Sequence, residues 1–314
     1  MDELDVKILR ALISESVVSP STAQVSSSLR NIAARLGADD ATVSYRYRRL
    51  RQTGCMSAWR LTVNPTFFGC RMVNVAADVQ SASSKPDMIR KLRLVHEVVA
   101  LTDFYGKALT VLIMYSTDES LSRVVELFSR ITDAERITQS RMALPRSGTS
   151  HLTETDLAII RALSADARRS TVLVAKELGI STKTVKNRVE RLRKENTIFP
   201  LPVLNFGSVP GFIPVQLSYT YSSRGAKGLV DRAVLSRFDA NYLFGGFADQ
   251  ESGSVMLSAP TMADVQRFLD WATSQEGVAS ARVDIPTNTS MFPEKVNELL
   301  EQRVEGGAIM RNGF

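Results

Sequence analysis

Cysteine and histidine are almost absent from this chain of 314 residues. Cys55 and Cys70 are its only cysteines, and His96 and His151 are its only histidines. These are too few for a disulfide framework or for a metal site built from thiolates and imidazoles. Two histidines also leave little scope for acid–base catalysis by imidazole groups. We therefore expect a reducing, cytoplasmic environment, no bound metal and no cofactor.

Long apolar runs are also missing. No window approaches the roughly 18 consecutive apolar residues that a membrane span requires. The acidic start, Met1 to Asp5, lacks the basic and then apolar layout of a signal peptide. Hydrophobic residues make up 44% of the chain and charged residues 23%, which is typical of soluble globular proteins. We expect a protein of about two or more domains without membrane association.

Positive charge is concentrated in two short segments. The formal net charge is +6; residues 1–62 carry +3 and residues 151–205 carry +4, whereas residues 206–314 carry −3. A basic excess confined to short segments is expected of a surface that binds a polyanion. Two solvated helical faces would give the same numbers, so charge alone leaves both interpretations open.

The chain repeats itself. Three segments of the first half recur in the second half in the same order: Asp5–Leu12 as Asp156–Leu163, Ile32–Gly37 as Val174–Gly179, and Arg49–Arg51 as Arg191–Arg193. The offset between the copies falls from 151 to 142 residues. The Ser-rich run 14–28 is a polar loop in which the extra residues of the first copy can lie. The sequence therefore predicts two fused copies of one module.

Each copy begins with three predicted helices. In the second copy Thr153 can cap a helix that reaches about Ala165, a second helix ends at Gly179, and Ser181 caps a third. The third helices carry apolar stripes at Val43, Tyr47 and Leu50 in the first copy and at Val185, Val189 and Leu192 in the second. Two helices, a turn with glycine and a third helix are typical of the helix-turn-helix motif.

Short strands follow each set of helices. They are expected near 71–79, 98–104, 109–115 and 135–141 in the first copy, and near 212–221, 241–248, 254–259 and 278–285 in the second. A helix between the first two strands and another between the last two give the ferredoxin-like order. Pro293 to Val304 is expected to form one further amphipathic helix.

The third helix of each copy has the composition of a helix that reads DNA, with polar side chains for bases and cations for phosphates. Lys186 is suited to guanine and Asn187 to adenine. The candidate DNA-binding residues are Ser44, Tyr45, Arg46, Arg48, Arg49, Arg51, Thr182, Lys183, Thr184, Lys186, Asn187, Arg188 and Arg191. The alternative is an ordinary solvent-exposed helix. Such a helix is stabilised by opposite charges four residues apart, and the arginines of residues 46–51 have no acidic residue at that spacing.

Leu152–Leu163 and Val174–Leu192 resemble the Lrp/AsnC family of transcription regulators, also called leucine-responsive or feast/famine regulators. Both copies share the pattern, so the chain resembles a tandem fusion of two normally separate subunits. Val63–Gly69 resembles the family's connector between domains, and Pro200–Gly207 is a looser match. The resemblance implies an α+β fold in which two winged helix-turn-helix domains alternate with two ferredoxin-like (βαββαβ) ligand-sensing domains.

Domain boundaries follow from the repeat and the resemblance. We expect helix-turn-helix domains at 1–62 and 153–205, ferredoxin-like domains at 63–144 and 206–286, a linker at 145–152, and a C-terminal helix and tail at 287–314. A ferredoxin-like sheet covered by helices on one face is expected to leave its other face apolar. The two domains should therefore pair within the chain, and the resemblance implies further association into homo-oligomers.

The resemblance also implies an effector site at a Gly-x-x-Asp turn between the second and third strands of the ferredoxin-like domain. Gly246 and Asp249 have this spacing in the second copy, whereas Gly106 of the first copy is followed by Leu109 at the acidic position. An ordinary hairpin turn is the alternative. An amino acid or another small molecule is the expected effector.

The expected function is sequence-specific binding of double-stranded DNA by a transcription regulator. Siroheme decarboxylases have a similar plan and also occur as fused pairs, but their chemistry needs cationic or imidazole groups that grip propionates. The strand segment Ala100–Tyr105 offers a tyrosine and neither arginine nor histidine, so we do not expect an enzyme. An architectural DNA-binding protein that needs no ligand is the other alternative.

Overall fold

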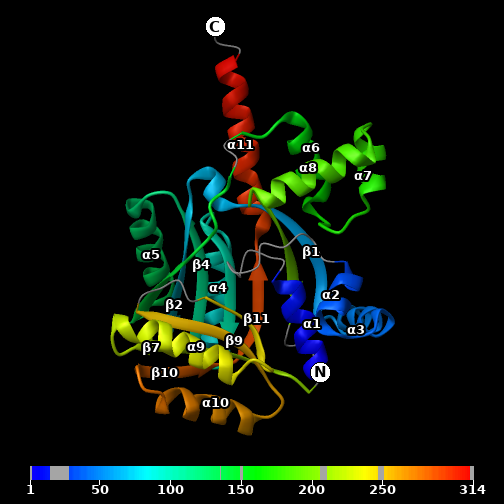
Figure 1. The fold of residues 1–314 in the computed structure, drawn as a ribbon. Coiled ribbons are helices and arrows are strands. Elements are labelled where there is room, and N and C mark those ends of the chain that lie inside the picture. Colours follow the sequence, from blue (N-terminus) through cyan, green and yellow to red (C-terminus); the bar gives the residue numbers. More distant parts are fainter. Residues whose placement is uncertain are drawn as a thin grey trace.

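The computed structural model describes residues 2–14, 28–134, 136–148, 151–205, 211–246 and 251–311. Two helix-turn-helix units lie on one side of the molecule and two β-sheet domains on the other (Figure 1). The first unit consists of α1 (Glu3–Ile13), α2 (Leu29–Leu36) and α3 (Asp40–Gln52). The second consists of α6 (Glu154–Ser164), α7 (Thr171–Leu178) and α8 (Thr182–Lys194). The Ser-rich loop expected between the first two helices lies largely outside the described residues.

The first helix of each unit begins with a capping box, in which the cap and the third helical residue bond each other's backbone amide. Asp2 and Asp5 form this arrangement in α1, and Thr153 and Asp156 form it in α6. The second helix of each unit ends at a glycine in the left-handed conformation, with φ of 61° at Gly37 and 64° at Gly179. The same local chemistry thus starts and ends the helices of both copies, as the repeat predicts.

The strand after each third helix pairs with its counterpart in the other copy. β1 (Met56–Val63) and β6 (Ile198–Leu204) form an antiparallel two-stranded ribbon, in which Trp59 faces Pro202 and Leu61 faces Pro200. A two-stranded ribbon tolerates prolines because each strand has one unpaired edge. The predicted fold class is confirmed with this difference: in the described residues neither unit forms a wing hairpin of its own, and the ribbon joins the two units instead.

The first ferredoxin-like domain has five strands. Its own strands are β2 (Arg71–Asp78), β3 (Val98–Phe104), β4 (Ala108–Tyr115) and β5 (Ile137–Met142), which follow the 3-10 turn η1 (Pro65–Phe68). They lie in the order β11-β3-β4-β2-β5. The short turn η2 (Ala82–Ser84) leads into α4 (Lys85–Arg93), and α4 and α5 (Asp118–Thr132) pack on one face of the sheet. Val73, Val111 and Phe128 lie in the core between the sheet and these helices.

The second ferredoxin-like domain has four strands, β7 (Ile213–Tyr221), β8 (Tyr242–Gly246), β9 (Ser252–Ala259) and β10 (Val278–Asp284), in the order β10-β7-β9-β8. The short turn η4 (Arg224–Ala226) leads into α9 (Lys227–Arg237), and α10 (Met262–Ser274) follows β9. Leu217, Val234 and Phe268 lie in the core between the sheet and the helices. Both domains therefore have the predicted element order.

The C-terminal segment crosses back to the first copy. β11 (Pro286–Met291) pairs with β3 and extends the first sheet, and α11 (Pro293–Arg311) follows it. Lys295 Nζ donates hydrogen bonds to the carbonyls of Arg93, Val95 and Val98 at 2.7–2.9 Å and so ties α11 to the end of α4. The sequence predicted the helix but not the strand. The polar residues of 286–291 give no strand pattern of their own, and they form a strand only by pairing with the edge of a sheet that is already folded.

The hydrophobic cores run across the two copies. Phe212, Leu243 and Met256 of the second ferredoxin-like domain pack into the core of the first helix-turn-helix unit with Leu9 and Leu12. Leu61 and Phe67 of the first copy and Leu300 of α11 pack into the core of the second unit. Each helix-turn-helix unit is therefore built with residues from the other copy.

The two sheets face each other with polar side chains, which corrects the expectation of apolar faces. Arg282 of β10 binds Asp78 of β2, with Nη1 3.0 Å from Oδ2, and Ser140 and Ser252 are 3.4 Å apart. The apolar part of the first sheet's open face, including Met72, is covered by α11. On the second sheet α1 covers the apolar part of that face. Since other elements bury these apolar parts, the sheets do not need an apolar contact with each other.

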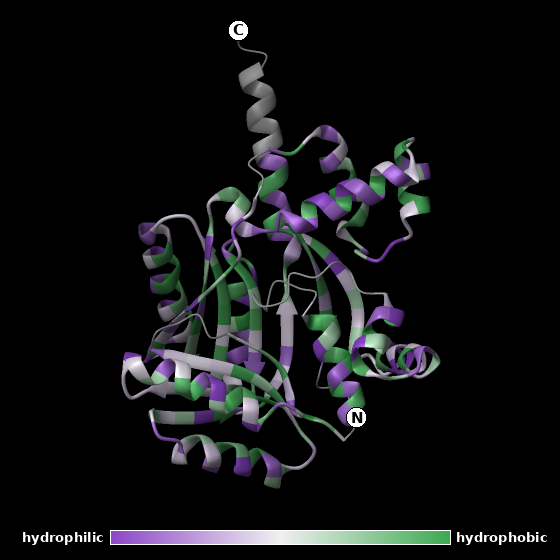
Figure 2. Cartoon of the chain, in the orientation of Figure 1, coloured by the Kyte–Doolittle hydropathy of each residue, from purple (hydrophilic) through white to green (hydrophobic). Residues whose placement is uncertain are grey.

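Hydropathy follows this arrangement (Figure 2): hydrophobic residues prevail in the strands of the first sheet, whereas hydrophilic bands prevail along α8. Among the described residues, no helix is both long and apolar enough to cross a membrane.

Candidate nucleic-acid interface

The third helix of the second unit, α8, is fixed on its inner side. Ser181 caps it by accepting a hydrogen bond of 3.0 Å from the Thr184 amide, and the Thr184 hydroxyl lies 2.8 Å from the Ser181 hydroxyl. Val185 and Leu192 are fully buried against α6 and α7. Because the inner side is buried, the opposite side of α8 faces solvent.

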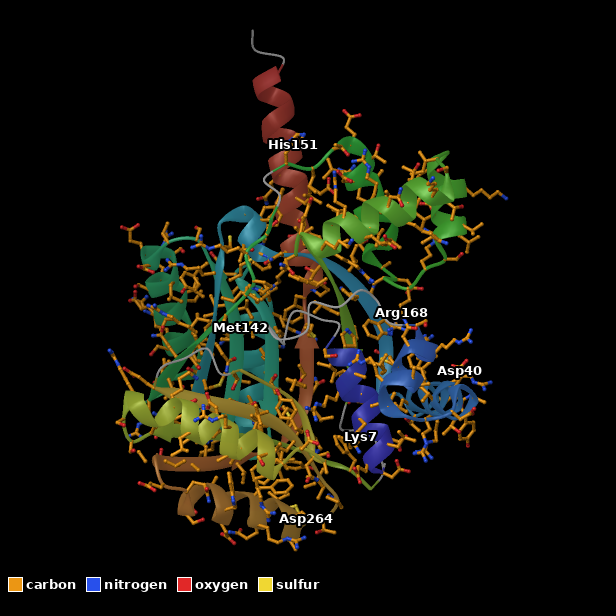
Figure 3. All side chains as sticks on the ribbon, in the orientation of Figure 1. Lys7, Asp40, Met142, His151, Arg168 and Asp264 are labelled. Atoms are coloured by element: carbon orange, nitrogen blue, oxygen red, sulfur yellow. The ribbon has the colours of Figure 1, made fainter. Side chains whose placement is uncertain are left out.

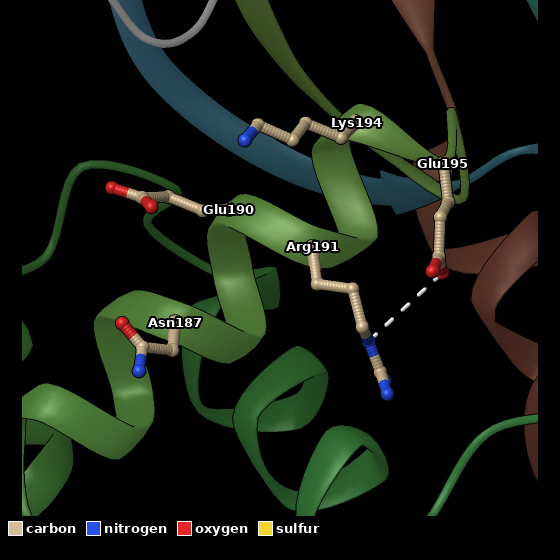
Figure 4. A pocket seen from close by; sticks show the side chains of 5 residues that line it. All are labelled: Asn187, Glu190, Arg191, Lys194 and Glu195. Carbon is tan, nitrogen blue, oxygen red and sulfur yellow. Dashed lines mark ion pairs between the residues drawn. The ribbon is translucent and has the colours of Figure 1, made fainter.

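The outward side of α8 carries the residues that the sequence assigned to base contacts. Lys183, Lys186 and Asn187 are exposed, and Thr182 is half-buried at the start of the helix. Along this side lies a shallow depression of about 330 Å³ whose lining residues are Asn187, Glu190, Arg191, Lys194 and Glu195 (Figure 4). Hydrogen-bond donors and acceptors, the groups that contact base edges, are thus available on one exposed helix surface.

The third helix of the first unit, α3, presents a different surface. Tyr45 is 61% exposed, Arg48 and Arg51 are exposed, and Ser44 is half-buried. Arg48 Nε donates to the Ser44 carbonyl at 3.3 Å. One aromatic ring and two arginines make this surface better suited to the sugar–phosphate backbone than to hydrogen bonds with base edges.

Four arginines among the candidate DNA-binding residues form ion pairs with buried carboxylates. Asp5 is fully buried and binds Arg46 (3.1 Å) and Arg49 (2.5 Å). These ion pairs connect the first and third helices, so Arg46 and Arg49 hold α3 in place. Arg46 also binds Asp2, 2.5 Å away, an ion pair that raises the pKa of its guanidinium.

The second copy repeats this arrangement. Asp156 is fully buried, with Arg188 at 3.4 Å and Arg191 at 2.6 Å. Burial raises the pKa of the Asp156 carboxyl, but hydrogen bonds from Thr153 and the Arg191 guanidinium outweigh it, so that the pKa lies below its ordinary value. The repeat contained a signal for this cluster, because it aligns Asp5 with Asp156 and Arg49 with Arg191.

The ribbon places both candidate surfaces on the same side of the molecule, with α3 and α8 on either side of β1 and β6 (Figure 1). Among the described residues, α3 packs mainly on α1, α2 and β1, and α8 packs mainly on α6, α7 and β6, so that neither helix is covered by a sheet domain. Both outward sides are therefore open to a large ligand.

The residues proposed for an effector are only partly visible. Gly246 is the last residue of β8, and Asp249 lies outside the described residues. Both cysteines are free thiols, and burial raises the pKa of Cys55 to about 12. In the part of the chain that the structure describes, no group of three or more His, Cys, Asp or Glu residues is placed to hold a metal ion.

Fold and interface together define a class: a protein with two helix-turn-helix units and two ferredoxin-like domains fused in one chain. Residues 152–193, which comprise α6, α7 and nearly all of α8, match the model of the AsnC-type helix-turn-helix domain. The predicted resemblance to the Lrp/AsnC family is thereby confirmed. The chain is also 28% identical over 124 residues to the HTH-type transcriptional regulator Ptr1 of Methanocaldococcus jannaschii, a match that covers 39% of this chain and 78% of that protein.

Solved structures share the whole architecture. The crystal structure of the siroheme decarboxylase NirDL aligns with a TM-score of 0.55 at 12% identity and covers 96% of this chain and 99% of that chain. Its complex with an iron-uroporphyrin III analogue gives a TM-score of 0.53 at 13% identity, with coverage of 97% and 99%. At such identities the likeness shows the fold alone.

This likeness corrects the expectation that the chain is not an enzyme. The expectation rested on the residues near Ala100–Tyr105 and treated the fused plan as that of a regulator. NirDL, an enzyme, has the same plan over nearly the full length of both chains. The arrangement of the domains therefore gives no ground for setting catalysis aside.

Proposed function

We propose that the protein is a transcription regulator that binds double-stranded DNA through α3 and α8 in the cytoplasm. The observation that carries the proposal is the coincidence of the AsnC-type match at 152–193 with an exposed helix surface bearing Lys183, Lys186 and Asn187. Lys186 donates to guanine and Asn187 pairs with adenine in this proposal. Arg48 and Arg51 of α3 contact phosphates, which attract cations regardless of base sequence.

Binding-site selection from random DNA followed by titration tests this proposal. Alanine at Lys186 or Asn187 should weaken binding to the selected site by about 1–3 kcal/mol for each base that is no longer recognised, and should relax specificity. Arg48→Ala should weaken binding to all sequences alike and reduce the salt dependence. Unchanged affinity in both sets of variants contradicts the assignment of these helices to DNA, and broad coverage without a preferred site favours an architectural role.

We further propose that an amino acid or another small metabolite binds the second ferredoxin-like domain at Gly246 and Asp249. The support is the Gly-x-x-Asp spacing, which the first copy lacks. Thermal unfolding with a panel of amino acids should show one or a few ligands that raise the melting temperature, because a ligand bound only to the folded state stabilises it. Asp249→Ala should abolish the shift, whereas Lys107→Ala, at an exposed position in the corresponding turn of the first copy, should retain the response to ligand.

A decarboxylase related to NirDL is the second candidate function, and the whole-chain architecture is the observation that favours it. Anaerobic incubation of the protein with siroheme, followed by mass spectrometry of the tetrapyrrole, tests it directly. Loss of carboxyl groups that depends on the protein would establish the enzyme, and unchanged siroheme together with selected DNA sites would establish the regulator.

A further inference from the structure

Besides the ribbon, a loop of the second helix-turn-helix unit contacts the first copy. The loop between α6 and α7 of the second unit reaches β1, which belongs to the first copy. Arg60 Nη1 of β1 donates to the Ala165 carbonyl at 3.1 Å, and the Ala167 amide donates to the Trp59 carbonyl at 3.1 Å. The loop therefore docks on the strand that follows α3.

Arg168 extends this contact to α3 itself. Its guanidinium carbon lies 4.1 Å from the centre of the Trp59 ring and 5.8 Å from that of Tyr47. Trp59 is 3% exposed and its Nε1 donates to the Tyr47 hydroxyl at 3.3 Å. A guanidinium over aromatic faces is attracted by their π electrons. Figure 3 shows Arg168 labelled between the two units.

Arg168 has no cationic counterpart in the sequence of the first copy. In the first copy the stretch between the first two helices, residues 15–28, contains neither lysine nor arginine. The loop contact thus adds to the β1–β6 ribbon a direct connection between the bodies of the two units.

We propose that Arg168 is a positioning residue that sets the orientation of α8 relative to α3, and thereby the spacing between the two DNA half-sites. The inference rests on the proposed DNA-binding function. The distance and angle between two recognition helices decide which half-site spacing a protein accepts, since each helix must enter its groove in register. Arg168 joins α8's unit to Tyr47, a residue of α3, and so acts directly on that geometry.

The experiment measures binding to DNA duplexes that carry the selected half-sites with spacers shortened or lengthened by one to three base pairs. The native protein should prefer one spacing. Arg168→Ala should lower this preference at least fivefold and leave the preferred bases within each half-site unchanged. Arg168→Lys, which keeps the positive charge over the rings, should restore part of the preference. A spacing profile in Arg168→Ala equal to the native profile would overturn the inference.

Arg169→Ala is the matched control. Arg169 lies in the same loop and has the same charge, but it binds Glu177 at 2.5 Å and the Ala162 carbonyl at 3.3 Å, both within the second unit. Its replacement should leave the spacing preference intact. Where Arg168→Ala fails to give native circular dichroism, Arg168→Gln keeps the aliphatic stem without the charge and serves for the same comparison.

A distance measurement separates this inference from the proposed function. Ala41 and Lys183 occupy equivalent exposed positions on α3 and α8, so nitroxide labels at Ala41→Cys and Lys183→Cys report on the relation of the two helices without DNA. Cys70→Ser removes the one native thiol that is partly exposed. Arg168→Ala should broaden the distance distribution and Arg169→Ala should not. A narrow distribution in Arg168→Ala refutes the inference, whereas absence of DNA binding by the native protein refutes only the function.

Discussion

At the scale of single residues, the buried aspartates of the two units show how charge is divided between folding and binding. Asp5 and Asp156 are fully buried, and each binds two arginines of the third helix. A buried carboxylate is costly unless it is paired and hydrogen-bonded. Part of the positive charge of the third helices therefore stabilises the fold. In the proposed function, the exposed cations such as Lys183 and Lys186 are those that contact DNA.

Replacing Asp156 with asparagine should lower the free energy of unfolding by roughly 2–3 kcal/mol at pH 7. The loss is below that of a fully buried pair because the Arg188 and Arg191 side chains are 33% and 39% exposed. The native pKa of Asp156 is lowered, so its stabilisation is complete above about pH 5 and is lost as the pH falls below about 4. Urea unfolding at pH 7 and pH 3.5 measures both effects.

The control for this prediction is an exposed ion pair. Asp118 and Arg71 are 2.8 Å apart, with side chains 78% and 48% exposed. Asp118→Asn should cost less than about 1 kcal/mol. Equal losses in the two variants, or a loss in Asp156→Asn that does not shrink at acid pH, would contradict the structural role of Asp156.

At the scale of secondary-structure elements, α11 links parts of the molecule that are far apart in sequence. Val296 packs against Met72, Val99 and Met114 of the first sheet, whereas Leu300 packs in the core of the second helix-turn-helix unit. Arg161 of α6 also forms an ion pair with Glu301. The C-terminal helix therefore stabilises both a sheet domain and a DNA-binding unit.

Leu300→Ala should lower the free energy of unfolding by about 2–4 kcal/mol, because it leaves a cavity in a core where the side chain is 2% exposed. The neighbouring Gln302 is exposed, and Gln302→Ala should stay within about 0.5 kcal/mol of the native protein. Thermal unfolding of the two variants measures the difference. Similar melting temperatures for the two variants would show that Leu300 of α11 does not stabilise the hydrophobic core of the second unit.

At the scale of the whole molecule, the fusion makes the two copies unequal. The first unit packs on the second sheet, where Arg10 Nη1 lies 2.6 Å from Asp239 Oδ1 and the guanidinium lies over Tyr242. The second unit packs on α11. In a symmetric homodimer every contact occurs twice. In this fused chain the two helix-turn-helix units can have different contacts with the rest of the molecule.

The preferred DNA site should therefore be asymmetric. The outward residues of α3 and α8 differ at equivalent positions: Ala41 against Lys183, Ser44 against Lys186, Tyr45 against Asn187, and Arg48 against Glu190. Each half-site should be specified by one copy, and changes in α8 should shift base preference more than changes in α3. Binding-site selection combined with a mass measurement of the complex tests this. A perfect palindrome selected by a complex that contains a single chain contradicts it.

The sequence by itself determined the local structure and the repeat. Caps such as Thr153 and Ser181, the left-handed Gly179 and the apolar stripe at Val185 are signals within a few residues, and they predicted the helices of the second unit and their order. The strands of the sheet domains followed in the same way, with the exception of β11. These features depend on backbone conformation and on periodicity, which the chain carries wherever it folds.

Only the tertiary structure decided which parts pair across the copies. Three contacts join residues more than a hundred positions apart: β1 pairs with β6, β11 pairs with β3 of the first sheet, and Arg168 lies over the rings of Trp59 and Tyr47. No local sequence pattern predicts such contacts, because the edge of a strand or the face of an aromatic ring can pair with many different segments. The rest of the fold decides which segment lies beside it. The division of the arginines between buried aspartates and solvent was settled in the same way, by the packing of the first helix against the third.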